Sequence, residues 1–462
     1  MNEGTCVGDK APVAELADRL VDGEVSTEHD VLAAQRTDEA YLTPSGWPLC
    51  SVYARSTADV VETMRWAARH RVPVVPRGAG TGLAGGALAG DGALVLSLER
   101  MTAVRELSVD DRLAVVEPGV ITADLARAAD ERGLMYPVDP GSASRSTLGG
   151  NLATNAGGFR CFKYGVTRES VLGLEVVLAD GRVVTTGHRT TKGVSGYDLT
   201  GLFVGSEGTL GVITGATLRL RSKAAGPRAT VAACFPDAAA AARAPLQLAR
   251  AGLLPSFLEL IDEVTLRAVR AYQPLDLPGD GEALLLAEFD GADAGGAAAR
   301  MGQLCGTLDA AVTVTTDEEE SERLLSVRRH ALGALERMGR TMVEDFVVPR
   351  SRLGDMLTEI RRIAARHDVL IGTVAHAGDA NLHPTLLFDR GEPEIPARVW
   401  AAADDMFRIA LRLGGTLTGE HGIGTLKRRW LRDELGDDAT DVHRTIKNAL
   451  DPLGIMNPGK VL

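Results

Sequence analysis

Two histidines stand at the ends of residues 376–383, a segment that could form a β-hairpin. If Asp379-Ala380 is a two-residue turn, His376 and His383 are directly opposite each other. Directly opposed residues of an antiparallel pair have Cβ atoms about 5 Å apart, which suits two imidazole ligands on one divalent ion. A residue with a side chain adopts positive φ only at a cost in free energy, so Ala380 leaves the type of turn open.

The alternative for this segment is a polar hairpin whose histidines are satisfied by hydrogen bonds. Three of the nine histidines of the chain fall either in this segment or in residues 419–424, where His421 lies among glycines. An isolated histidine would favour the polar hairpin, whereas this concentration favours a metal site.

A glycine-rich stretch at residues 76–86 is suited to binding phosphate. It holds five glycines and follows residues 72–75, a β-branched run that predicts a buried strand. Glycine leaves N–H groups bare and the backbone free to wrap closely around an anion. A flexible surface loop would more often carry Ser, Asn and Asp, so we interpret the stretch as a phosphate cradle.

The same stretch contains a G-x-G-x-x-G match at residues 80–85, with Glu99 near the acidic position of a nicotinamide-binding unit. The next strand-like run, residues 93–98, follows too soon. A parallel crossover through a helix needs about a dozen residues or more, and residues 90–92 (Gly-Asp-Gly) would break such a helix. The sequence therefore predicts a phosphate cradle of a different architecture.

The composition and charge of the chain argue against some classes of binding partner. The chain has 462 residues and a net charge of −12, without a basic cluster, which argues against nucleic acid and anionic lipid as main partners. The five cysteines are scattered and include no C-x-x-C, which fits a reducing compartment and excludes a local iron–sulfur cluster. The first twenty residues have no signal-peptide pattern, and no apolar run is long enough to span a membrane.

The pattern along the chain predicts two α+β regions joined by a linker at residues 222–227. Before it we expect a helical lead-in over residues 1–45, a helix capped by Ser56 or Thr57, a strand at 113–117, a helix at 122–132, a hairpin at 174–178 and 182–186, and a strand near 218–221. After it we expect one antiparallel sheet with strands near 230–234, 284–289, 312–315, 343–347 and 370–376, and helices near 238–250, 317–337, 353–367 and 397–413.

Six motifs occur in an order that resembles a known family. They are residues 76–86, 140–158, 205–214, 376–383, 419–424 and 457–460. The chain is similar to the FAD-linked oxidases of the vanillyl-alcohol oxidase/p-cresol methylhydroxylase (PCMH) superfamily, in the branch of the glycolate oxidase FAD subunit, D-lactate dehydrogenases and D-2-hydroxyglutarate dehydrogenases. The resemblance implies an α+β fold, with a two-subdomain PCMH-type FAD-binding domain at 43–222 and a cap with an antiparallel sheet at 223–418. A lead-in at 1–42 and a C-terminal segment at 419–462 that returns to the FAD domain complete the expected organisation.

The resemblance implies that residues 77–82 hold the pyrophosphate of FAD and that residues 140–158 line the flavin. Several relatives attach FAD through a histidine at the position of Thr81, so we expect a noncovalent flavin here. The residues expected at the cofactor are Pro76, Arg77, Gly78, Ala79, Gly80, Thr81, Gly82, Pro140, Gly141, Thr147, Gly149, Gly150, Asn151, Thr154, Asn155, Gly157, Gly158, Gly205, Glu207, Gly208, Leu210, Val212, Ile213 and Asn457.

The resemblance also implies a metal on His376, His383 and Glu420, with zinc as the family-like ion and manganese or iron as alternatives. His421 matches the proposed base of the relatives, and its alternatives are a fourth ligand or a hydrogen bond to the flavin. Arg328 matches an arginine that binds the substrate carboxylate, against the alternative of a solvated helix face.

The function implied is oxidation of a small 2-hydroxy acid, of the D-lactate or glycolate type, to the 2-oxo acid by hydride transfer to N5 of FAD. Some D-2-hydroxyglutarate dehydrogenases carry a lysine where this chain has Val343-Glu344, which favours a monocarboxylate. Electrons would leave to a quinone, a cytochrome, an iron–sulfur subunit or oxygen. Two alternatives stay open: a non-redox transferase like alkyl-glycerone-phosphate synthase, and a flavin subunit active only within a complex. We expect a cytoplasmic location, with peripheral association at the inner face of the membrane left open, and make no prediction of oligomeric state.

Overall fold

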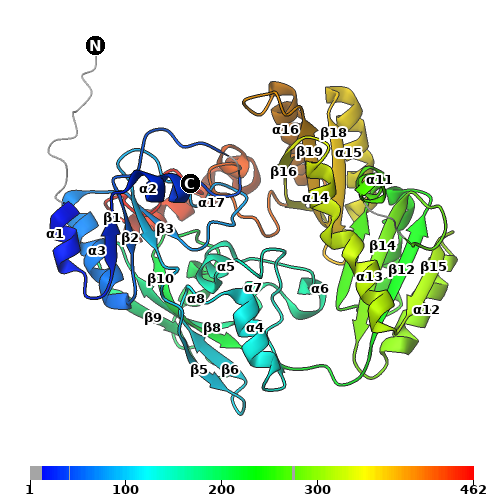
Figure 1. The fold of residues 1–462 in the computed structure, drawn as a ribbon, viewed down its shortest axis with the longest axis horizontal. Coiled ribbons are helices and arrows are strands. Elements are labelled where there is room, and N and C mark those ends of the chain that lie inside the picture. The colour runs from blue at the N-terminus through cyan, green and yellow to red at the C-terminus, as the bar shows by residue number, and fades with distance from the viewer. Residues whose placement is uncertain (1–12, 41, 273–275) are drawn as a thin grey trace.

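The computed structural model describes residues 13–40, 42–272 and 276–462. Its elements form two lobes (Figure 1). One lobe holds the strands up to β10 together with the C-terminal helix α17 (Leu431–Leu450), and the other holds the large sheet of the middle of the chain. None of the helices in the described ranges is both long enough and apolar enough to cross a lipid bilayer.

The first lobe opens with a four-stranded sheet of order β1-β2-β4-β3. Its strands are β1 (Glu24–Ser26), β2 (Cys50–Tyr53), β3 (Val74–Arg77) and β4 (Leu94–Ser97). In the expected helical lead-in, β1 lies between α1 (Val13–Arg19) and α2 (His29–Gln35) and pairs with β2; residues 1–12 lie outside the described ranges.

The glycine-rich stretch connects β3 directly to β4. Residues 78–93 contain no helix, as predicted, yet β3 and β4 pair in parallel, with Val74 opposite Leu94. The stretch itself therefore makes the parallel crossover. Ahead of it, α3 (Thr57–His70) begins with the predicted cap: the Ser56 hydroxyl accepts from the Asp59 N–H in a capping box.

A second sheet of five strands has the order β5-β6-β10-β8-β9. The strands are β5 (Val104–Ser108), β6 (Leu113–Val116), β8 (Val171–Val177), β9 (Val183–Gly187) and β10 (Val212–Arg219), and the helices α4 (Thr122–Asp130) and α5 (Leu148–Thr154) belong to the same lobe. The predicted hairpin is confirmed as β8–β9. The strand expected near 218–221 begins earlier, at Val212, because the third glycine motif ends in a β-branched run that pairs at once with β8.

Short elements lie between the strands of the second sheet or directly after its last strand. They are β7 (Leu134–Met135), which pairs with β11 (Arg221–Ser222), and the helices α6 (Cys161–Tyr164), α7 (Thr167–Ser170) and α8 (Leu199–Phe203).

The second lobe is built on one antiparallel sheet of order β15-β12-β14-β13-β18-β19-β16, with β17 also on β19. The strands are β12 (Arg228–Phe235), β13 (Phe257–Ile261), β14 (Ala283–Asp290), β15 (Ala311–Thr315), β16 (Arg340–Val343), β17 (Phe346–Val347), β18 (Leu370–His376) and β19 (Asn381–Phe388). The predicted antiparallel sheet is confirmed; β13 and the helix after it were not predicted.

Helices cover both faces of this sheet, and each face has its own apolar core. One core includes α9 (Ala238–Ala241), α10 (Ala244–Arg250), α12 (Ala294–Gly306), α15 (Leu353–His367) and α16 (Ala397–Arg412). The other includes α11 (Glu263–Tyr272), α13 (Glu318–Arg329) and α14 (Ala331–Glu336). The single helix expected over 317–337 is wrong in its continuity, because the chain leaves α13 at His330 and starts α14 after it.

The C-terminal segment returns to the first lobe, where Met456 bridges Val74 of β3 in parallel. The Val74 N–H donates to the Ile455 carbonyl at 2.8 Å, and the Asn457 N–H donates to the Val74 carbonyl at 2.8 Å. Lys447 of α17 fixes this return by donating to the carbonyls of Thr209 (2.7 Å) and Met456 (2.8 Å) and to Asp451.

Candidate active site

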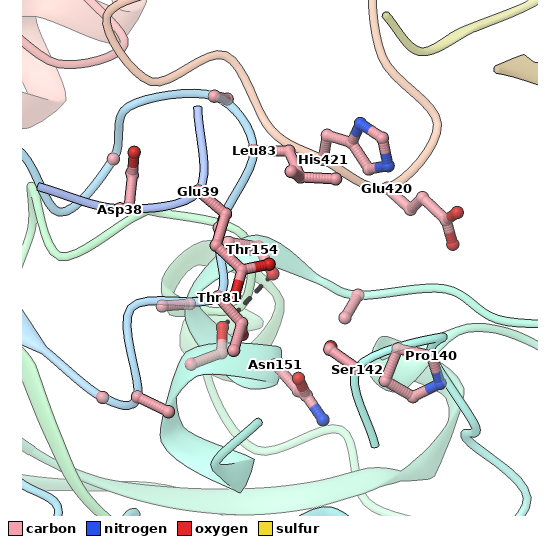
Figure 2. A pocket seen from close by; sticks show the side chains of 18 of the residues that line it. Asp38, Glu39, Thr81, Leu83, Pro140, Ser142, Asn151, Thr154, Glu420 and His421 are labelled. Carbon is pink, nitrogen blue, oxygen red and sulfur yellow. Dashed lines mark hydrogen bonds between the residues drawn. The ribbon is translucent and has the colours of Figure 1, made fainter. Parts of the chain in front are cut away.

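A cavity of about 700 Å³ lies where the two lobes and the C-terminal segment meet. The glycine-rich stretch and α5 contribute Thr81, Asn151 and Thr154, and the C-terminal segment contributes Glu420 and His421. Figure 2 shows these side chains around a common space. Nineteen of the predicted cofactor residues line the cavity; Asn155, Gly158, Gly205, Leu210 and Asn457 are not among its lining residues.

Glycines in the cavity wall are required by close packing of backbone and side chain. A Cβ on Gly78 would meet Thr147 Oγ1 at 2.2 Å, and one on Gly149 would meet Pro118 Cβ at 2.5 Å. Bare backbone therefore forms the wall, and its N–H groups are available to a phosphate group. The donor set and the size of the cavity fit a dinucleotide such as FAD.

Two of the predicted cofactor side chains instead hold protein backbone. Arg77 donates from Nη1 to the Thr37 carbonyl at 2.8 Å, and the Glu207 carboxylate accepts the N–H groups of Ile423 and Gly424, both at 2.8 Å. Both residues also line the cavity, so their side chains hold its wall in place.

The predicted register of the histidine hairpin is wrong. His376 lies opposite Asn381 and His383 opposite Val374, so residues 377–380 form a four-residue turn. A two-residue type I′ turn needs φ > 0 at both central positions; Ala380 has φ +56°, whereas Asp379 is absent from the positive-φ residues. The two histidines are diagonal neighbours on one face of the sheet, and their ring centroids are 5.0 Å apart.

Glu420 completes a cluster of three donors. Its Oε1 lies 3.2 Å from His376 Nε2 and 3.1 Å from His383 Nε2, and the ligand atoms all lie within 4.8 Å of one another. Ligands bonded at about 2.0–2.1 Å to a tetrahedral ion are separated by roughly 3.3 Å. Two nitrogens and one carboxylate oxygen at these separations fit a divalent ion such as zinc.

The charges in this cluster stabilise each other. Burial disfavours the imidazolium of His376, but the Glu259 and Glu420 carboxylates outweigh burial and hold its pKa well above the usual value. Burial also disfavours the Glu420 carboxylate, yet His376 and His383 hold its pKa well below the usual value. The cluster therefore favours an ionised Glu420 beside a protonated His376.

Asp345, which directly precedes β17, supports the loop that carries Glu420. Its Oδ2 accepts the N–H groups of Gly419 (2.9 Å), Glu420 (3.1 Å) and His421 (3.0 Å) and the Thr418 hydroxyl (2.5 Å). A single fully buried carboxylate oxygen thus fixes three successive backbone amides, and with them the directions of the Glu420 and His421 side chains.

His421 lies in the cavity beside the cluster of His376, His383 and Glu420. Its ring stacks on that of His383 with centroids 5.0 Å apart and an interplanar angle of 23°. Burial lowers the pKa of His421 to about 4, although the Asp345 carboxylate opposes the shift. The ring is therefore neutral near pH 7 and can accept a proton.

Arg328 lines the same cavity, as predicted, but Glu259 binds one edge of it. Arg328 Nε donates to Glu259 Oε2 at 2.7 Å, and its guanidinium carbon lies 5.0 Å from the Phe159 ring centroid. Within the described ranges the Nη groups make no hydrogen bond or ion pair, which leaves this edge of the fork for a ligand. Glu259 and Asp345 were missed from the sequence because neither belongs to a glycine-flanked motif.

The chain is similar to known proteins along most of its length. Residues 226–461 match the family model of the C-terminal domain of FAD-linked oxidases, and residues 48–187 match an FAD-binding domain model. The chain is 42% identical over 418 residues to the glycolate oxidase subunit GlcD of Bacillus subtilis, covering 90% of this chain and 89% of that protein. It is 38% identical over 416 residues to a D-lactate dehydrogenase of Archaeoglobus fulgidus, covering 88% and 90%.

Solved structures share the fold at low identity. A p-cresol methylhydroxylase with substrate bound superposes with a TM-score of 0.78 at 19% identity, covering 97% of this chain and 96% of that chain. An alkyldihydroxyacetonephosphate synthase superposes with a TM-score of 0.74 at 18% identity, covering 96% and 84%. The PCMH-type fold expected from the motifs is confirmed, and the chain is an FAD-binding oxidoreductase that belongs to the family of FAD-linked oxidases.

Proposed function

We propose that this enzyme oxidises a small 2-hydroxy acid to the 2-oxo acid, with FAD bound noncovalently and one divalent ion on His376, His383 and Glu420. The observation that carries the proposal is that this donor cluster, His421 and Arg328 line the same cavity as the glycine-rich loops. Relatives named glycolate oxidase subunit and D-lactate dehydrogenase support this substrate class.

The chain's own residues divide the work on the substrate. FAD when bound would supply the hydride acceptor, and a divalent ion would supply a Lewis acid for the hydroxyl oxygen. Arg328 binds the carboxylate through its Nη edge, since a planar guanidinium suits bidentate pairing. His421, neutral and next to Glu420, accepts the hydroxyl proton, which must leave as the carbon loses its hydride.

The cavity wall favours a monocarboxylate. Val343 lines the cavity, while Glu344 points away from it, is fully buried and has Lys427 Nζ 4.0 Å from its Oε2. Burial raises the pKa of Glu344 to about 7. Neither Val343 nor Glu344 supplies a cation for a second substrate carboxylate, which supports lactate or glycolate over a dicarboxylate.

An anaerobic screen of 2-hydroxy acids tests the substrate class. After anaerobic mixing, D-lactate and glycolate are expected to bleach the flavin absorbance. D-2-hydroxyglutarate is expected to bleach it more slowly or to a smaller extent. If no 2-hydroxy acid bleaches the flavin, the redox proposal fails. The alternative of a non-redox transferase then gains support, because this chain shares its fold with alkyldihydroxyacetonephosphate synthase.

Metal analysis tests the second part of the proposal. After dialysis, one divalent ion per chain is expected, with zinc ahead of manganese and iron, and EDTA should abolish flavin reduction. Protein without a stoichiometric ion whose activity survives EDTA would mean that the three residues form only a polar cluster.

The electron acceptor and any partner subunit are tested by reconstitution. Relatives carry the name subunit, so a partner that accepts electrons is one proposed route, beside a quinone, a cytochrome or oxygen. Reoxidation of the reduced enzyme should distinguish them: rapid reoxidation by a quinone would support a peripheral position at the inner face of the membrane, and turnover only with a co-purified partner would support a complex.

A further inference from the structure

Glu259 joins the two parts of the site that act on the substrate. It lies on β13 directly opposite His376 of β18, and its side chain is fully buried. One carboxylate oxygen contacts His376 Nδ1, and the other accepts from Arg328 Nε at 2.7 Å. No other described carboxylate contacts both a residue of the metal cluster and the arginine beside it.

The direction of these hydrogen bonds fixes the state of His376. A carboxylate accepts only, so Nδ1 carries a proton toward Glu259, and the proton on Nε2, which faces Glu420 at 3.2 Å, is the one that a metal ion would replace. Arg328 Nε–H is likewise a donor at any ordinary pH, so the second oxygen leaves its two Nη groups facing the cavity.

We propose that Glu259 is a positioning residue that sets the metal-binding tautomer of His376 and the orientation of Arg328 at the same time. This inference rests on the proposed metal site and deepens it. Because the carboxylate spans the two, a change in the metal pocket is transmitted to the substrate-carboxylate pocket through a single rigid side chain.

Glu259→Gln separates the two roles. Arg328 Nε–H still needs an acceptor, so the amide oxygen turns toward it and the amide NH₂ faces His376. His376 must then accept at Nδ1, which moves its proton to Nε2, where it blocks metal binding. The expected result is a loss of Zn²⁺ affinity of about 10–100-fold, the range for lost outer-shell partners.

The experiment is a Zn²⁺ titration of chelator-treated, FAD-loaded protein against a competing chromophoric chelator. Activity of Glu259→Gln is expected to recover at saturating Zn²⁺, with KM for the hydroxy acid within about twofold of wild type because Arg328 keeps its acceptor. A merely structural role would show no such rescue by metal. The matched control is Glu288→Gln on the neighbouring strand, a buried carboxylate whose nearest cations are Arg228 at 3.7 Å and Arg160 at 3.9 Å; its Zn²⁺ affinity should stay unchanged.

Three results would overturn the inference. Wild-type protein that binds no Zn²⁺ removes the metal site and the inference with it. If the wild-type protein binds Zn²⁺ and folded Glu259→Gln binds it with the same affinity, the metal site stands and only the role of Glu259 is refuted. If Glu259→Gln does not fold, Glu259→Asp replaces it: this shorter carboxylate cannot reach both partners, so weaker Zn²⁺ binding or a raised KM is expected, and no change in either would refute the role.

Discussion

At the scale of single residues, burial and stacking decide what His421 can do. Its ring lies against His383 and its pKa is lowered to about 4 by burial, opposed by Asp345. The imidazole next to Glu420 is therefore neutral near pH 7 and keeps a free lone pair. Such a group contributes to the chemical step rather than to substrate binding.

His421→Ala is therefore expected to keep FAD and the metal while flavin reduction by substrate slows by roughly 10²–10⁴. Stopped-flow absorbance under saturating substrate measures the rate, and flavin and metal contents are measured on the same sample. Near-normal reduction in a fully loaded variant would eliminate the base, and loss of the metal would make His421 a ligand.

Thr81 bears on the flavin linkage. A threonine hydroxyl at this cavity-lining position cannot form the histidyl bond of some relatives, so acid precipitation should release all the flavin into the supernatant. Absorbance of pellet and supernatant measures the split, with free FAD added to unfolded protein as the control for trapping. Yellow colour retained by the washed pellet would contradict the prediction.

The sequence indicated residues that line the site but not the residues that hold them in position. His376 and His383 were singled out by their spacing within one hairpin, whereas Glu420 and His421 were implied by the resemblance to a known family. Glu259 is 117 positions from His376, and Asp345 is more than 70 positions from the loop it holds. Only strand pairing and burial create these contacts, and no local spacing encodes them.

At the scale of elements, one helix holds the return of the chain to the first lobe. Lys447 on α17 donates to two carbonyls and to Asp451, which is itself buried. Burial lowers the pKa of Lys447, and Asp451 opposes that shift. Residues 455–457, which pair with β3, depend on this ammonium for their position.

Lys447→Met should destabilise the protein by about 1.5–3 kcal/mol, the range for hydrogen bonds to a charged group, since three acceptors lose their donor. Urea unfolding followed by flavin fluorescence measures the change. Lys223→Met is the control, because Lys223 pairs with Asp130 at the surface with half its side chain exposed and should cost less than about 1 kcal/mol. Equal effects of the two variants would refute a role for Lys447 in holding the tail.

The hairpin shows the limit of predicting elements from pattern. Residues 370–376 were predicted as a strand and form β18, but the register depended on the turn. Asp379 does not adopt the left-handed conformation that a two-residue turn requires, and the turn contains four residues instead. The histidines still share a face because a shift of two residues preserves the alternation of a strand.

At the scale of the whole molecule, the cluster of His376, His383 and Glu420 lies in contact with both lobes. The histidines come from the second lobe, Glu420 from the returning segment, and Gly157 of the first lobe packs against Glu420. A Cβ at Gly157 would meet Glu420 Oε2 at 2.3 Å. The position of the Glu420 carboxylate therefore depends on the space that Gly157 of the first lobe leaves beside it.

Gly157→Ala is expected to displace the Glu420 carboxylate and weaken Zn²⁺ binding by about tenfold or more, with little effect on folding because a side-chain end can move. The control is Gly295→Ala in α12, where a new Cβ has no neighbour within 4 Å. Competition titration with a chelator measures affinity. Unchanged affinity in Gly157→Ala would show that the cluster does not depend on the first lobe.

The pairing of Val74 with residues 455–457 has a consequence for synthesis on the ribosome. β3 is translated early, but its outer edge gains a partner only after roughly 380 further residues, or about 20–80 s at common elongation rates. During that interval the glycine-rich loop is attached to an incomplete sheet, and the nascent chain is a candidate client for chaperones. Cofactor capture is thereby postponed until translation has passed Met456, so polypeptides truncated before that point should emerge colourless.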